Sequence, residues 1–112
     1  MPKKEKGLLT VSYSFENVQE QNALVMTVEN PELVSLKSTQ VFSIVLETLL
    51  EEPQALLIDL RHVKIASSLA LGSVVNALQK AEKLNRKMYF RISPEVREVL
   101  EVSGLEERLK IL

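Results

Sequence analysis

ALLIDLRHVKIASSLALGSVVNALQKA, residues 55–81, is the stretch that decides the fold. It opens with a short aliphatic segment, residues 56–59, which has no polar alternation and is typical of a strand covered on both faces of a sheet. A polar turn and an apolar run, residues 63–66, lead to Ser67 and Ser68. Apolar residues then recur at the i, i+3, i+4, i+7 spacing of an amphipathic helix. Two serines at a helix start present hydroxyls and free backbone N–H groups, which suit anion contact or partner docking.

The flanking sequence predicts further strands and helices by the same periodicities. The expected strands are 8–15, 23–28, 56–59 and 88–92, and the expected helices are 36–50, one starting after Ser67 and one starting after Ser93. We expect a turn at 16–22, helix N-caps at Ser67 and Ser93, and a helix-terminating glycine at Gly104. The order β-β-α-β-α-β-α predicts an α/β domain, with a mixed central sheet, an N-terminal antiparallel hairpin and helices packed against the sheet.

Composition restricts the classes of function. The chain has 112 residues, which favours one domain, and we expect residues 1–7 to form a disordered basic tail and residues 8–112 to form the domain. The 14 Lys and Arg residues against 15 Asp and Glu residues give no electrostatic case for a nucleic-acid binder. The sequence lacks a signal-type stretch and a membrane-length apolar run. We therefore expect a cytoplasmic, bacterial protein.

The sequence offers no recognisable catalytic or metal-binding set. No cysteine is present, which excludes disulfides and thiolate chemistry. The one histidine, His62, has no motif that pairs it with a nucleophile, and a solvated turn histidine is the preferred interpretation. The three glycines, Gly7, Gly72 and Gly104, are isolated and form no phosphate-binding loop. We predict a protein without catalytic residues, metal or cofactor, and therefore not an enzyme.

The sequence contains two motifs that are read together. The first motif consists of Leu57-Ile58-Asp59-Leu60, Val63, Ser67-Ser68 and Leu71-Gly72, and the second is SPEVREVLEVSGL, residues 93–105. Both motifs resemble the STAS domain of bacterial anti-sigma factor antagonists. The second motif is similar to the closing helix of the family and the turn after it. The resemblance covers the chain from about Leu24 onward and implies a STAS-like fold. The family usually has one more helix after this point, and we expect that helix to be absent from these residues.

In the family, an Asp-Ser-Ser-Gly-Leu-Gly pattern carries a serine that a partner kinase phosphorylates. The ungapped register places Ser67 at the Asp of that pattern and Leu69 at the phosphorylated serine, so the acceptor hydroxyl is replaced. A register shifted by one residue keeps Ser68 as a candidate phosphorylation site, with Ala66 at the Asp. We prefer the ungapped register, because the shift needs an extra residue between Ser68 and Gly72.

The resemblance also implies a partner and a docking surface. The predicted contact residues are Ser67, Ser68, Leu69, Ala70, Leu71, Gly72, Ser73 and Asn76, the last two on the outer face of the helix. The implied partner is an anti-sigma factor kinase, and the implied role is regulation of transcription without the serine switch. An alternative is a STAS subunit of an ABC-type lipid transporter, which docks on the ATPase subunit. We expect a monomer or weak homodimer, and self-assembly through the hairpin at residues 8–28 is a third hypothesis.

Overall fold

The computed structural model describes residues 8–112, and the predicted tail, residues 1–7, lies outside them. A central sheet has five strands in the order β1-β2-β4-β6-β7. Its strands are β1 Val11–Val18, β2 Gln21–Val28, β4 Ala55–Leu60, β6 Met88–Ile92 and β7 Lys110–Ile111. The other elements are the short strands β3 Glu32–Leu33 and β5 Ile65–Ala66, the helices α1 Leu36–Leu49, α2 Ser68–Lys83 and α3 Pro94–Ser103, and the 3-10 helix η1 Glu106–Arg108.

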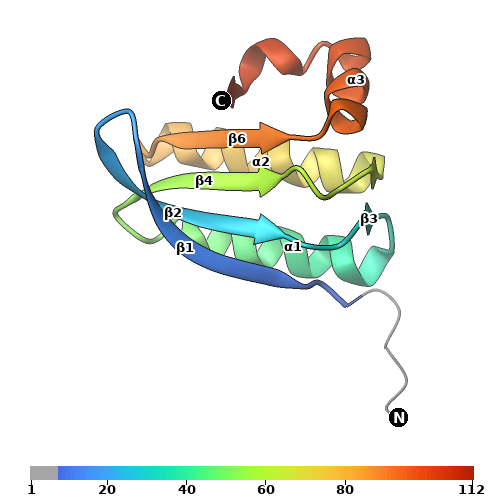
Figure 1. Cartoon of the computed structure of the whole chain (residues 1–112), viewed down its shortest axis with the longest axis horizontal. Coiled ribbons are helices and arrows are strands. Elements are labelled where there is room, and N and C mark those ends of the chain that lie inside the picture. The colour runs from blue at the N-terminus through green and yellow to red at the C-terminus, as the bar shows by residue number, and fades with distance from the viewer. Residues whose placement is uncertain (1–7) are drawn as a thin grey trace.

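The strand directions confirm the predicted mixed sheet. Strands β1 and β2 are antiparallel, and the β2–β4, β4–β6 and β6–β7 pairs are parallel. Helices α1 and α2 lie side by side against one face of this sheet, and α3 lies beyond the end of β6 (Figure 1). The prediction missed β3 and β5, which pair with each other, and also β7. Each has two residues, too few for a periodic pattern. In place of a further helix after α3, the described chain ends in η1 and β7.

The main core fills the space between the sheet and helices α1 and α2. Met26, Ile58 and Phe90 lie at matching positions on three neighbouring strands and are fully buried. A smaller apolar cluster on the opposite face of the sheet consists of Val18, Ala23, Val25, Ala55, Leu57 and Tyr89. All six residues of β4 are buried between these two layers, which explains why its sequence does not alternate.

The N-terminal hairpin extends further than predicted. The turn lies within the predicted range 16–22 but is shorter than expected, because β1 continues to Val18 and β2 starts at Gln21. The connection is a two-residue turn, in which Gln19 and Glu20 have φ angles of 48° and 66°. Positive φ at both central positions is the geometry of tight hairpins, but Asn and Gly are the usual signals for it, and neither is present. The tip of the hairpin buries Val18 in the smaller cluster.

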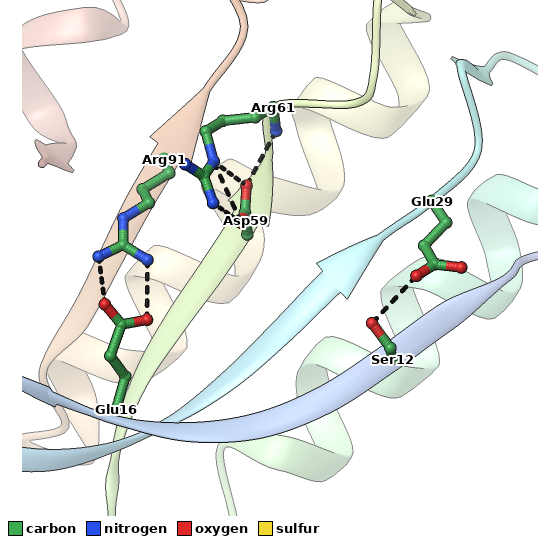
Figure 2. Close-up of polar contacts among 6 residues, drawn as sticks. All are labelled: Ser12, Glu16, Glu29, Asp59, Arg61 and Arg91. Atoms are coloured by element: carbon green, nitrogen blue, oxygen red, sulfur yellow. Dashed lines mark hydrogen bonds and ion pairs between the residues drawn. The ribbon is translucent and has the colours of Figure 1, made fainter.

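Charged side chains fix the hairpin across the sheet face that the helices leave open (Figure 2). The Arg91 guanidinium donates to both carboxylate oxygens of Glu16, at 2.6 and 2.9 Å. The Arg61 guanidinium donates to Asp59 at 2.7 Å, and the Arg61 backbone N–H donates to the same carboxylate at 3.0 Å. Burial of Asp59 opposes its ionisation, but the hydrogen bonds from Arg61 outweigh burial and lower the pKa of Asp59. Each arginine therefore holds one carboxylate in its charged form.

The predicted helix caps are confirmed, and Ser93 has a second role. Its hydroxyl accepts a hydrogen bond from the Val96 backbone N–H at 3.2 Å, which caps α3. The same hydroxyl donates to the Val63 carbonyl at 2.5 Å and is buried, so it links the loop after β4 to the start of α3. Gly104 ends α3 in the left-handed region, at φ 74°, as predicted.

We predict that Ser93→Ala lowers the free energy of unfolding by about 1–3 kcal/mol, because it removes a cap and leaves the Val63 carbonyl without this donor. Urea unfolding followed by circular dichroism measures the change. Ser103→Ala is the control, because the Ser103 hydroxyl is exposed and donates only along its own helix. That variant should stay within about 0.5 kcal/mol of the natural chain. Equal losses in the two variants would contradict the linking role of Ser93.

We also predict that Asp59→Asn lowers stability at neutral pH and flattens its dependence on acid pH. The folded protein binds the Asp59 proton more weakly than the unfolded chain does. The stabilisation is therefore fully present above the unfolded pKa of about 3.9 and disappears as the pH falls through the lower folded pKa. Urea unfolding from pH 7 down to pH 2 should show the two proteins converging at the acid end. The exposed Glu107→Gln should follow the natural chain throughout, and a constant gap for Asp59→Asn would contradict the linkage.

Candidate functional site

The N-terminus of α2 is held in place by hydrogen bonds on both sides of the serine turn. Strand β5 pairs with β3, and the Ser67 backbone N–H donates to the Leu33 carbonyl at 3.0 Å. The Ser67 hydroxyl accepts a hydrogen bond from the Ala70 backbone N–H at 3.2 Å, which caps the helix as predicted. Ser67 is therefore already engaged in fixing the turn, and the residues after it define what the turn presents.

The predicted contact residues separate into two groups at this helix start. Ala70 and Leu71 are buried and pack in the main core, so their side chains position the turn without offering a surface. Ser68, Leu69 and Gly72 point outward, and the Leu69 side chain is 59% exposed. This side chain leaves apolar surface uncovered in the first turn of the helix, beside Ser68, and covering that surface would favour docking.

The outward residues form one wall of a shallow groove between α1 and α2. The groove has a volume of about 370 Å³ and is lined by Leu36, Thr39, Gln40, Ser43, Ser68, Leu69, Gly72, Ser73 and Asn76. The second wall comes from α1, and none of its residues was among the predicted contact residues. Its four lining residues form no recognisable sequence motif, and only the packing of the two helices shows that they face the serine turn.

The groove combines an apolar rim with neutral polar groups. Leu36 and Leu69 are both about 60% exposed at their helix starts. Ser73, predicted on the outer helix face, is nearly buried, and its hydroxyl donates to the Leu69 carbonyl at 3.0 Å. The Thr39 hydroxyl is buried beneath the groove wall and has no hydrogen-bond partner in the described chain, so it offers nothing at the groove surface. None of the nine lining residues carries a charge.

Gly72 lies in the middle of this surface. It is exposed, and a Cβ atom added there would meet nothing within 4 Å beyond the neighbouring residues and backbone of its own helix. Glycine in a helix interior is less stable than alanine by roughly 0.5–1 kcal/mol. The fold of the described chain therefore gives no steric reason for this glycine, whereas a partner backbone that approaches the helix closely would give one.

Residues 8–112 contain no group of three or more acidic or histidine side chains arranged to hold a metal ion. His62 is exposed in the turn after β4. Within the described part of the chain, no helix has the length and apolar character needed to cross a membrane. The groove is thus the feature of the described surface that fits best with the residues singled out in the sequence.

Comparisons with solved structures agree with the observed fold. An anti-sigma factor antagonist from Mycobacterium paratuberculosis matches with a TM-score of 0.71 at 16% identity, over 91% of this chain and 85% of that chain. A putative anti-sigma factor antagonist from Thermotoga maritima matches with a TM-score of 0.62 at 19% identity, over 88% and 84% of the two chains. The phosphorylated form of the Bacillus cell fate determinant SpoIIAA also gives a TM-score of 0.62, at 16% identity, over 90% and 91%.

A search of curated proteins gave no match. The model of the STAS domain family matches residues 14–112, which is nearly the whole described chain and contains both of the motifs that resemble the family. The chain therefore belongs to the STAS domain family.

Proposed function

We propose that this STAS domain is a non-enzymatic protein-interaction domain of the anti-sigma factor antagonist type. It docks on an anti-sigma factor kinase through the outward residues of the serine turn and the adjoining groove, and in this way it regulates transcription. The observation that carries the proposal is the exposure of Leu69 in the first turn of α2. Structural similarity to anti-sigma factor antagonists supports the same class of function.

The exposed Leu69 also supports docking without a phosphorylation switch. On the ungapped register, this leucine occupies the position at which the family carries its acceptor serine. A leucine cannot be phosphorylated, and its exposed side chain favours contact with an apolar surface. A phosphate would bring close to two negative charges to the interface, and no such change is available at this position. Binding is therefore constitutive or is controlled at another place.

The chemistry of the groove describes the surface that the partner must present. Because none of the lining residues is charged, attraction between opposite charges contributes little at this site. The apolar rim and the exposed polar side chains of Gln40, Ser68 and Asn76 fit a partner segment with apolar side chains and neutral hydrogen-bonding groups. Such contacts weaken little with salt, in contrast to docking between charged patches.

The first test is a pull-down from native cell lysate with the full chain and with Leu69→Asp, followed by mass spectrometry. We expect the natural chain to capture an anti-sigma factor kinase and Leu69→Asp to lose it, because a charge would be desolvated at the contact. Val102→Asp is the matched control, since Val102 is 87% exposed on α3 and outside the groove. Capture of a transporter ATPase would favour the alternative role. Capture of the kinase by Leu69→Asp as efficiently as by the natural chain would contradict the proposal. Phosphate incorporation at Ser68 by the captured kinase would contradict it as well.

Gly72→Ala tests the close approach of the partner. We expect this variant to be more stable than the natural chain by roughly 0.5–1 kcal/mol, because alanine is the better helix former. We expect its affinity for the captured partner to fall at least tenfold, because the added methyl group occupies the space of the partner backbone. Urea unfolding and calorimetric titration measure the two effects. Gln79→Ala, at an exposed position further along α2, should leave the affinity unchanged. A stabilised variant with unchanged affinity would show that the partner does not approach Gly72 closely.

A further inference from the structure

The outer edge of β1 differs from the opposite edge of the same sheet. Strand β7, at the far edge, has two residues and includes Lys110, which are common ways of blocking an edge. Strand β1 has eight residues, and its unbroken register with β2 contains no bulge. It includes neither lysine nor proline. No strand within residues 8–112 pairs with its outer side. Apart from Glu16, the β1 edge therefore lacks the usual protection against pairing with another strand.

The backbone groups that face this open edge follow from the register of the hairpin. The Glu29 backbone N–H donates to the Thr10 carbonyl, at 2.9 Å, so even-numbered residues of β1 form the hydrogen-bonded pairs with β2. In an antiparallel pair the alternate residues point their N–H and C=O groups the other way. The outward-directed groups therefore belong to Val11, Tyr13, Phe15 and Asn17.

Two of these four residues also expose aromatic side chains. Tyr13 is 51% exposed and Phe15 is 60% exposed. They lie opposite Met26 and Leu24 on the face of the sheet that carries the helices. The one charged residue of β1, Glu16, lies on the other face and is paired with Arg91 (Figure 2). An open ladder, exposed aromatic side chains and a neutralised charge thus coincide on one strand.

We propose that β1 pairs antiparallel with β1 of a second copy of this chain, about a two-fold axis at Ser14. The outward-directed residues have odd numbers, so hydrogen-bonded pairs can form only when two odd-numbered residues are opposite each other. Centring the axis on Ser14 pairs Tyr13 with Phe15 of the second copy, and Val11 with Asn17. In this arrangement all four outward-directed residues of each copy form hydrogen-bonded pairs with the other copy. An axis at Tyr13 or Phe15 would allow only three of them to do so.

The side chains are complementary in the same arrangement. The two Tyr13–Phe15 pairs place aromatic rings across the new strand pair, which is a favourable cross-strand combination. Each Glu16 lies opposite Ser12 of the second copy, and the two carboxylates are not opposite each other. The result is a continuous sheet with the helices of both copies on the same side. The groove between α1 and α2 stays open in each copy, so this proposal does not depend on the proposed function.

Engineered cysteines test the pairing and its register, because the natural chain has no cysteine. Ser14→Cys would lie opposite its own copy in a non-hydrogen-bonded pair, with a Cα–Cα separation of about 4.5 Å, which is within disulfide range. Ser12→Cys, on the same exposed face, would be separated from its own copy by about 13 Å. Under mild oxidation of the full chain, we expect Ser14→Cys to form disulfide dimers at least tenfold faster than Ser12→Cys. Equal rates would overturn the proposed axis.

Sedimentation velocity over a concentration series tests the association without cross-linking. We expect the natural chain to dimerise as its concentration rises, and Phe15→Lys to weaken dimerisation at least tenfold by adding a charge to the edge. Ile44→Lys is the matched control, since Ile44 is 63% exposed on α1, and it should dimerise as the natural chain does. The proposal would be overturned if the natural chain stayed monomeric at millimolar concentration. It would also be overturned if Ile44→Lys lost dimerisation while Phe15→Lys kept it. Leu69→Asp should dimerise normally, which separates this test from that of the docking site.

Discussion

The burial of β4 on both faces is the constraint on which the rest of the structure depends. One face of this strand is covered by α1 and α2, and the other requires an apolar cover that no helix supplies. The hairpin tip provides that cover by placing Val18 against the smaller cluster, and the Glu16–Arg91 ion pair fixes it there. Asp59 interrupts the apolar strand near its end, and the structure accommodates the buried carboxylate because Arg61 supplies hydrogen bonds from both its side chain and its backbone.

Sequence periodicity predicted the parts of the fold that are long or chemically local. The helices span several turns, and their caps at Ser67, Ser93 and Gly104 act within three or four residues, so each leaves a pattern that can be read directly. The turn at residues 16–22 was predicted too long, because the two-residue conformation at Gln19 and Glu20 is imposed by the strands that it joins, not by its own residues. The α1 wall of the groove was missed because it arises from the packing of two helices that are distant in sequence.

Within the predicted docking site, the helical repeat divides the residues between fold and surface. Ser67 caps the helix, and Ala70 and Leu71 belong to the core, which leaves Ser68, Leu69 and Gly72 directed outward. Six consecutive residues therefore serve both purposes, and the sequence pattern alone did not separate them. To tell the core residues from the surface residues, one must know how α2 is oriented relative to the sheet. The parallel pairing of β3 and β5 fixes that orientation just before α2 begins.

The crossing of the hairpin tip over the sheet has a consequence for the order of folding. Strands β1 and β2 are joined by two residues and can pair within microseconds. The contacts that hold the tip involve Tyr89 and Arg91, which are 70 and 75 residues away along the chain. Contacts between residues so distant in sequence require closure of a long loop, and they form slowly. The tip is therefore synthesised early, and we expect it to reach its native contacts only after β6 has joined the sheet.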